Sequence, residues 1–120
     1  MGNCGNLEGY PLEIKEIVST KEFFRNIQDG MTLIFFSAPW CAPCHLQEPI
    51  LREIAARFKG KTSINAVNVD QSPEIARNLG IQIVPTSILF KKGKEIERFI
   101  GLQSEGKFSD AIERLINMGG

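Results

Sequence analysis

Apolar segments rich in β-forming residues alternate along the chain with segments whose hydrophobic residues recur every three or four positions. The first pattern is typical of strands and the second of helices. Strands are predicted over 12–18, 32–37, 64–69, 86–91 and 95–100. Helices are predicted from Ser19 to Gly30, over 44–58, from Ser72 to Gly80, and from Ser104 onward. The segment 32–37 is apolar on both faces, as expected for a central strand covered on two sides.

The predicted helices begin at recognisable capping residues. Ser19-Thr20-Lys21-Glu22 forms a capping box, in which the Glu22 side chain reaches back to the Ser19 N–H. Ser72-Pro73-Glu74 supplies an N-cap, a proline at the first helical position and an acidic residue near the helix dipole. Strand and helix alternate three times before a hairpin and a last helix. This order predicts an α/β fold: a mixed, mostly parallel sheet with helices on both faces and a C-terminal β-hairpin plus helix.

Composition indicates one compact domain without a strong charge preference. Lysine and arginine total 14 among 120 residues, and aspartate and glutamate also total 14. A net charge of zero gives no reason to expect nucleic acid or a membrane surface as a partner. No apolar stretch approaches the length of a membrane span, and the N-terminus lacks the features of a signal peptide. We therefore expect a flexible leader over 1–11, a domain over 12–118, a cytoplasmic location and a monomer.

Two cysteines carry the clearest chemical signal. Trp40-Cys41-Ala42-Pro43-Cys44 follows the predicted strand 32–37 and opens a predicted helix. Two intervening residues let the sulfurs close a small disulfide ring. Unpaired N–H groups and the positive end of the dipole at a helix start favour a thiolate on Cys41 and lower its pKa. Cys44, one turn inside, is expected to be more buried and to stay protonated until needed.

Five separated features resemble the thioredoxin family, and they follow one another in the family's order. They are Ala38-Pro39-Trp40-Cys41-Ala42-Pro43-Cys44, Pro49 within the next helix, Val67-Asn68-Val69-Asp70, Gly80-Ile81 leading to Val84-Pro85-Thr86, and Leu89-Phe90-Lys91-Lys92-Gly93. A CxxC pair alone is moderately specific, but its combination with Val-Pro-Thr about forty residues later is much more so. The resemblance covers nearly everything after the leader.

The resemblance implies a thioredoxin fold and a thiol–disulfide oxidoreductase that carries electrons and serves redox homeostasis. Cys41 would attack a disulfide in a partner protein, and Cys44 would resolve the mixed disulfide. An external reductase, such as thioredoxin reductase, would recharge the dithiol without a bound cofactor or metal. Pro85 would be a cis proline facing the dithiol. The implied substrate-binding residues are Trp40, Val84, Pro85, Thr86 and Gly101, and the residues that tune the dithiol are Ala42, Pro43 and Phe35.

Several positions depart from the family pattern. Phe35 stands where the family commonly has a buried aspartate, and Ala66 stands where the opposing lysine is expected. An apolar environment penalises a thiolate, so we predict that the pKa of Cys44 is raised and that resolution is slower or uses another base. Ser37 replaces the usual tryptophan, Ala42 the usual glycine and His45 the usual basic residue.

Two residues have more than one interpretation. Cys4, in the Gly/Asn-rich leader, is either an incidental thiol or a third redox partner. His45 is an exposed helix residue, a tuner of the dithiol charge or a metal ligand. A helical residue that follows Cys44 projects about 100° away from it, which favours the first of these. A metal site would need four ligands, and adjacent Cys44 and His45 lack zinc-finger spacing.

Three functions are compatible with the motif. The main prediction is a general reductase of protein disulfides. The alternatives are a specialised oxidase or isomerase of the same fold, which the missing aspartate keeps open, and a partner-binding module in which turnover is incidental. The joint presence of Cys41, Pro43, Cys44 and Val84-Pro85-Thr86 argues against the binding module.

Overall fold

The computed structural model describes residues 14–118, which form five strands and four helices. The predicted leader over 1–11, with Cys4, and the predicted domain start at residue 12 lie outside the described residues. Within 14–118, no helix combines the length and the apolar character that crossing a bilayer requires.

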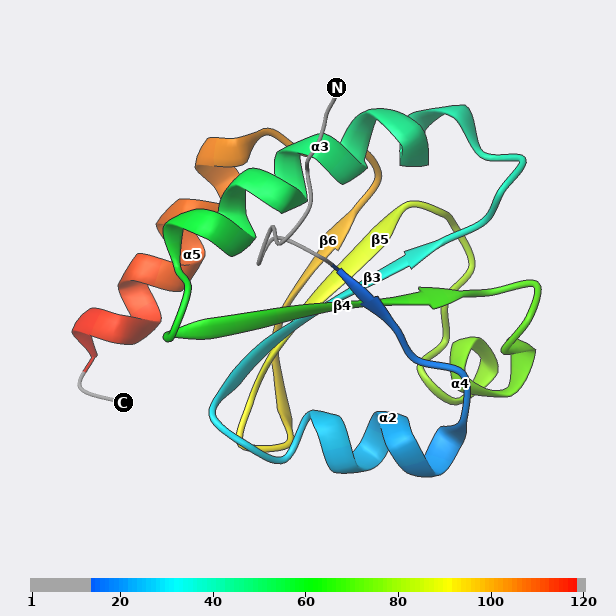
Figure 1. Cartoon of the computed structure of the whole chain (residues 1–120), viewed down its shortest axis with the longest axis horizontal. Coiled ribbons are helices and arrows are strands. Elements are labelled where there is room, and N and C mark those ends of the chain that lie inside the picture. The colour runs from blue at the N-terminus through cyan, green and yellow to red at the C-terminus, as the bar shows by residue number, and fades with distance from the viewer. Residues whose placement is uncertain (1–13, 119–120) are drawn as a thin grey trace, which may run out of the picture.

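The strands form one mixed sheet (Figure 1). Its order is β2 (Lys15–Glu16), β4 (Thr62–Asn68), β3 (Met31–Ser37), β5 (Thr86–Lys91) and β6 (Lys94–Ile100). Strands β2, β4 and β3 are parallel, whereas β5 is antiparallel to β3 and β6 is antiparallel to β5. The predicted mixed sheet and C-terminal hairpin are confirmed. Because β5 is antiparallel to β3 and β6 is antiparallel to β5, three strand ends lie together at the carboxyl end of the parallel strands. They are the end of β3, the start of β5 and the end of β6.

Helices cover both faces of the sheet. Helices α3 (Ala42–Arg57) and α5 (Glu105–Asn117) lie on one face, and α2 (Thr20–Asn26) and α4 (Pro73–Asn78) lie on the other (Figure 1). Side chains of β3 alternate between the two cores: Leu33 and Phe35 pack in the first, Ile34 and Phe36 in the second. This alternation explains the unbroken apolar run in the sequence, because a strand with two covered faces buries every side chain.

The first strand is shorter than predicted. The expected range was 12–18, but β2 comprises only Lys15–Glu16. The Ile17 N–H still donates to the Ala66 carbonyl at 2.8 Å. The chain then leaves the sheet, because Ser19 adopts an extended conformation as the N-cap of α2. Residues 12 and 13 lie outside the described part of the chain.

The predicted N-cap residues of α2 and α4 are confirmed, but not every predicted capping hydrogen bond forms. Ser19 Oγ accepts a hydrogen bond from the Glu22 N–H at 3.1 Å, as a capping box requires. The Glu22 carboxylate, however, accepts from the Val18 N–H at 3.4 Å instead of from Ser19. Ser72 is the N-cap of α4 but makes no capping bond, and its hydroxyl donates to the Val18 carbonyl at 3.4 Å. This bond joins the loop before α4 to the loop before α2.

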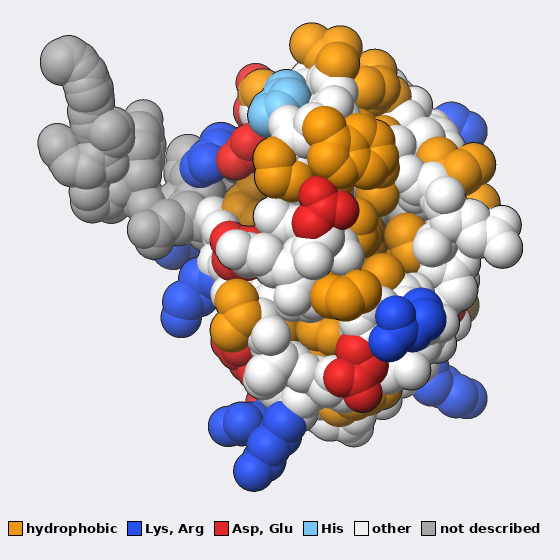
Figure 2. Space-filling view, turned by 90° about the vertical axis from the view of Figure 1, so that its right-hand side faces the viewer, with side chains coloured by type: hydrophobic (Ala, Val, Ile, Leu, Met, Phe, Trp, Pro, Cys, Tyr) orange, Lys and Arg blue, Asp and Glu red, His pale blue; other side chains and the backbone are white. Residues whose placement is uncertain are grey.

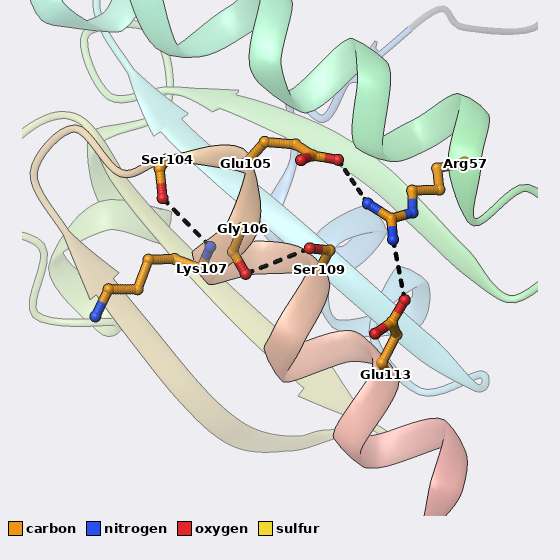
Figure 3. A network of polar contacts seen from close by, with 7 residues as sticks. All are labelled: Arg57, Ser104, Glu105, Gly106, Lys107, Ser109 and Glu113. Atoms are coloured by element: carbon orange, nitrogen blue, oxygen red, sulfur yellow. Dashed lines mark hydrogen bonds and ion pairs between the residues drawn. The ribbon is translucent and has the colours of Figure 1, made fainter.

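Helices α3 and α5 are joined by a polar network at the surface (Figure 3). Arg57, the last residue of α3, contacts Glu105 at 2.8 Å and Glu113 at 3.1 Å. Ser104 caps α5 by accepting from the Lys107 N–H at 3.4 Å. Exposed ion pairs contribute little stability each, about 0 to 1 kcal/mol. Their clearer effect is on orientation, because one guanidinium bridges two turns of α5.

Candidate active site

Cys41 and Cys44 are joined by a disulfide at the start of α3, with their Cα atoms 5.3 Å apart. Cys41 is the N-cap residue, in an extended conformation with φ −94° and ψ 107°. The Cys44 N–H donates to Cys41 Sγ at 3.2 Å. An N–H group of the first helical turn therefore points at the sulfur of the first cysteine, as the sequence predicts. The same donor would stabilise a thiolate there.

The two cysteines do not differ in exposure in this disulfide-bonded state. Cys41 is 3% exposed and Cys44 is 4% exposed. The expectation that Cys44 is the more buried of the two is therefore wrong for this state. Both residues belong to the core cluster that includes residues of the sheet and of α3. Ala42 and Pro43, which lie between the two cysteines, are exposed.

A second chain segment reaches the same edge of the sheet. The Val84–Pro85 peptide bond is cis, as the resemblance implied, and Val84 packs against the core cluster that contains both cysteines. Thr86 follows as the first residue of β5 and pairs with Phe36 of β3. Its hydroxyl donates to the Ile83 carbonyl. The bend before β5 is thus held by a side chain as well as by the strand pairing.

Gly101 lies beside this bend. It follows the last residue of β6, and its N–H donates to the Pro85 carbonyl at 2.8 Å. Its φ of +84° is in the region that favours glycine, whereas a Cβ there would meet nothing within 4 Å. Glycine is needed for the backbone conformation, not for space. The structure therefore brings Val84, Pro85, Thr86 and Gly101 to one place.

Trp40 forms one wall of a groove next to the disulfide. The groove has a volume of about 350 Å³, and we call it the Trp40 groove; it is lined by Trp40, Val69, Ile81, Gln82, Ile83 and Val84. Trp40 is 69% exposed and Ile83 is 55% exposed. Figure 2 looks onto this side of the molecule and shows hydrophobic side chains gathered over its upper part. Exposed apolar side chains around a groove are typical of a binding surface.

A hydrogen bond holds the Trp40 ring. Its Nε1–H donates to Asp70 Oδ2 at 3.0 Å. Asp70 is itself placed by a turn in which Asn68 Oδ1 accepts from the N–H groups of Asp70 and Gln71, at 2.9 and 3.2 Å. In the sequence, Asp70 stands out only as part of the Val67-Asn68-Val69-Asp70 motif. Its contact with Trp40 spans thirty residues, and nothing in the local sequence indicates it.

A pocket of about 230 Å³ opens on the other side of Cys44. We call it the Cys44 pocket, and its lining includes Glu16, Phe35, Cys44, His45, Glu48 and Ala66. Phe35 is paired in register with Ala66, so the two departures from the family pattern lie side by side. The sequence suggested an apolar environment for Cys44. Its surroundings are not wholly apolar, however, because two carboxylates, Glu16 and Glu48, also line the pocket. The predicted rise in the pKa of the Cys44 thiol stays a prediction.

The sequence profile named Thioredoxin matches residues 14–114. The chain belongs to the thioredoxin family. Among curated thioredoxins, that of Chlamydia caviae is 39% identical over 102 residues, covering 85% of this chain and 95% of the relative. That of Staphylococcus saprophyticus is 35% identical over 97 residues, covering 81% and 93%.

Solved structures give the same result. Oxidised mitochondrial thioredoxin 3 from Saccharomyces cerevisiae is 27% identical with a TM-score of 0.78, covering 84% of this chain and 94% of that chain. A mutant thioredoxin from Halobacterium salinarum is 29% identical with a TM-score of 0.78, covering 89% and 94%. The fold is therefore the thioredoxin fold, and the protein is a thiol–disulfide oxidoreductase. Thioredoxins act on disulfide-bearing substrates, are reduced by thioredoxin reductase and need no cofactor.

His45 lies on the exposed side of α3, as favoured by the sequence. Its Nε2 is 3.0 Å from the Pro39 carbonyl, and the residue lines the Cys44 pocket. Within residues 14–118, no group of three or more histidine, cysteine or acidic side chains is placed to hold a metal ion. Cys4, which the metal alternative included, lies outside that range.

Gln47 is a site residue that sequence reasoning missed. It is fully buried in α3. Its Nε2 donates to the Gln103 carbonyl at 3.0 Å, and its Oε1 accepts from the Gln103 N–H at 2.8 Å. These two bonds attach the segment after Gly101 to the helix that carries the disulfide. The only signal in the sequence was an amide on a helix face that is otherwise apolar.

Proposed function

We propose that this thioredoxin-family protein reduces disulfide bonds in partner proteins, with Cys41 as the nucleophile and Cys44 as the resolving cysteine. The observation that carries the proposal is the Cys41–Cys44 disulfide, which caps α3 at the edge where the cis Val84–Pro85 bond also lies. A reversible disulfide at a helix start is the arrangement that dithiol exchange requires.

The reaction proceeds in two exchanges. Cys41 thiolate attacks a substrate disulfide, forming a mixed disulfide and releasing the first substrate thiolate. Cys44 then attacks Cys41 Sγ, closing the Cys41–Cys44 disulfide and releasing the second substrate thiolate. Two electrons pass from the dithiol to the substrate. The bond from the Cys44 N–H to Cys41 Sγ supports the assignment of Cys41, because it favours negative charge on that sulfur.

The substrate segment lies along the Trp40 groove and the bend before β5. Trp40 and Val84 supply apolar contacts, and the backbone at Val84 pairs with an extended substrate chain, bounded by Pro85, Thr86 and Gly101. Pro43 lacks an N–H and limits backbone freedom between the sulfurs. Ala42 and Phe35 adjust the surroundings of the dithiol, the latter by filling space beside Cys44.

A dithiol that a reductase must recharge works in a reducing compartment, so we place the protein in the cytoplasm, as a monomer whose partners are disulfide-bearing proteins and a thioredoxin reductase. Neither nucleic acid nor a membrane takes part. Detergent-free fractionation and light scattering of the full chain test location and oligomeric state.

The test is reduction of a protein disulfide, such as those of insulin, coupled to a thioredoxin reductase. Cys41→Ser should abolish turnover, and Cys44→Ser should accumulate a covalent complex with the substrate. If Cys41→Ser keeps its full biological effect through binding alone, the protein is a binding module instead.

A specialised oxidase or isomerase is the second candidate, and Phe35 in place of a buried aspartate favours it. A redox titration of the Cys41–Cys44 pair decides between the two. The reference potential of thioredoxin is about −270 mV, so a midpoint near or below about −250 mV supports a reductase. A midpoint above about −200 mV supports the oxidase or isomerase.

A further inference from the structure

The resolving step requires Cys44 to lose a proton in a place that disfavours charge. Cys44 is 4% exposed, and Phe35 lies beside it in the same core cluster. Burial without a compensating partner penalises the thiolate. A thiol that must react from such a place needs a nearby group to take its proton. Neither Phe35 nor Ala66, which face each other across β3 and β4, can do so.

Cys44 and a carboxylate of the edge strand β2 line the same pocket, the Cys44 pocket. Glu16 of β2 is paired in register with Ala66 of β4, and Ala66 is paired with Phe35 of β3. Paired residues of neighbouring strands project to the same face of a sheet, so all three side chains lie on the side of α3. Cys44 and Glu16 line the same pocket. Its volume of about 230 Å³ leaves room for water, which occupies about 30 Å³ per molecule.

The other ionisable groups of the pocket are His45 and Glu48, both from α3. Glu48 is paired with Arg52 at 2.7 Å, and His45 Nε2 contacts the Pro39 carbonyl at 3.0 Å. The lining residues of β3 and β4 carry no charge: Phe35, Ser37, Ala66 and Asn68. Across the described part of the chain, Glu16 forms no ion pair and no side-chain hydrogen bond. Of the two carboxylates that line this pocket among the described residues, Glu48 is paired with Arg52 and Glu16 is not paired with a cation.

We propose that Glu16 accepts the Cys44 proton, through water in the Cys44 pocket, when Cys44 resolves the mixed disulfide. The S–H bond of Cys44 breaks, and its proton passes to the Glu16 carboxylate. The Cys44 thiolate forms the bond to Cys41 Sγ, and the Cys41–substrate S–S bond breaks. The departing substrate sulfur takes both electrons of that bond and a proton from solvent, while Glu16 returns its proton to water. The dithiol is oxidised and the substrate disulfide is reduced.

This inference rests on the proposed roles of Cys41 and Cys44, but it can be tested without a protein substrate. Reduced protein is mixed with excess 5,5′-dithiobis(2-nitrobenzoate) in a stopped-flow instrument. The first thionitrobenzoate is released when Cys41 attacks the reagent, and the second when Cys44 attacks the mixed disulfide. All proteins compared carry Cys4→Ser, which removes the third thiol of the chain, so the second phase reports the resolving step alone.

Glu16→Gln should slow the second phase about tenfold near neutral pH and leave the first phase unchanged. Between about pH 6 and about pH 9, the rate in Glu16→Gln should rise more steeply with pH than in the wild type, and the two should converge where hydroxide removes the proton. Glu16→Asp should recover part of the lost rate. A merely structural role of Glu16 would instead shift both phases by one factor at every pH.

Glu48→Gln is the matched control, because it removes a carboxylate from the same pocket that is already paired with Arg52. Its second phase should stay within about twofold of the wild type. Equal second phases in Glu16→Gln and wild type at every pH would overturn the proposal, as would an effect of the same size in Glu48→Gln or a slow phase only in His45→Gln. Denaturant unfolding of oxidised Glu16→Gln verifies that the variant folds.

Failure of the proposed function gives a different result. If the protein reduces no protein disulfide, both thionitrobenzoate phases still report on Cys41 and Cys44. If both phases are missing from the wild type, the roles of the cysteines are wrong, and the assignment of Glu16 fails with them.

Discussion

The two sides of the disulfide are built differently. On the Trp40 groove side, backbone groups and apolar side chains meet: the cis Val84–Pro85 bond, the Gly101 N–H that donates to the Pro85 carbonyl, and the exposed Trp40 ring. On the Cys44 pocket side, a row of side chains across three strands meets the helix: Glu16, Ala66 and Phe35.

The two sides differ in how strictly the fold limits the residues that can serve there. The groove side keeps the residues that the thioredoxin resemblance implied, because an extended substrate backbone can be recognised only by matching backbone geometry. The pocket side has lost the expected aspartate and lysine. A proton acceptor needs only a titratable group and a short path to the thiol, and several strands can supply one. The substrate side is therefore restricted to one geometry, whereas the proton side tolerates replacement.

The largest expected effect comes from removing the sulfur atoms of Cys41 and Cys44, which lie between the Trp40 groove and the Cys44 pocket. Cys41→Ser should lower the rate of protein disulfide reduction by about 10³-fold or more, since a hydroxyl is not an effective nucleophile towards sulfur at neutral pH. Cys44→Ser should instead give a stable mixed disulfide, seen by mass spectrometry. Turnover of Cys41→Ser within about tenfold of the wild-type rate would contradict the assignment of the nucleophile.

The next effect is on stability, on the pocket side. Phe35→Asp puts a carboxylate into the core and should lower the free energy of unfolding by about 3 to 5 kcal/mol at pH 7. Burial raises the pKa of this carboxyl, so the protonated form is tolerated at low pH. The loss should therefore be smaller near about pH 4, the ordinary aspartate pKa, and grow as pH rises towards the folded-state pKa.

Phe35→Leu is the control for that experiment, because it removes volume without adding charge. Its loss in unfolding free energy should be about 1 to 2 kcal/mol and independent of pH. Urea unfolding at several pH values measures both variants. Equal pH profiles for Phe35→Asp and Phe35→Leu would mean that position 35 is open to solvent.

A smaller effect is expected on the groove side. Gln47→Leu removes the two bonds to the Gln103 backbone and should cost about 1 to 2 kcal/mol of stability. Because Gln103 follows the Gly101 segment, KM for a protein substrate should rise about threefold, while both thionitrobenzoate phases stay unchanged. Gln103→Ala keeps the backbone groups that Gln47 binds and should change KM little. A slower second phase in Gln47→Leu would mean that the two sides are coupled through α3.

The smallest effect is expected at a partly exposed ion pair on β6. A hydrogen bond from the Arg98 guanidinium lowers the pKa of the Glu95 carboxyl. Its stabilisation is present above the ordinary glutamate pKa of about 4.3 and is lost as pH falls through the folded-state value. Both side chains are partly exposed, so Glu95→Gln should cost no more than about 0.5 kcal/mol after screening by solvent. Urea unfolding at pH 7 and at pH 3 should differ between the variants only at pH 7.

Much of the fold follows from local patterns. The strand 86–91 was predicted with the bounds that the structure has, and the apolar run at 32–37 correctly indicated a central strand. The ends of strands and the capping bonds of helices were predicted less well where two interactions compete for one segment. The first strand stops early, shortly before Ser19 begins α2, and Ser72, the N-cap of α4, makes no capping bond but donates to the Val18 carbonyl.

The site shows the same division. Cys41, Cys44, Trp40 and Pro85 could be named from the sequence, because a CxxC at a strand-to-helix junction and a Val-Pro-Thr segment are compact motifs. Asp70 and Gln47 could not, because their partners lie thirty and fifty-six residues away. Equal burial of the two cysteines also escaped prediction, since it depends on what packs over the closed disulfide.

By itself, the sequence determined the order of the elements and the position of the dithiol at the start of a helix. Those features depend on residues a few positions apart, where periodicity and capping act. Only the tertiary structure decided that Gly101 meets Pro85, that Gln47 holds the neighbouring segment, and that Glu16 shares a pocket with Cys44. These contacts depend on strand register and on how α3 packs against the sheet, and both are set by the whole chain burying its apolar surface at once.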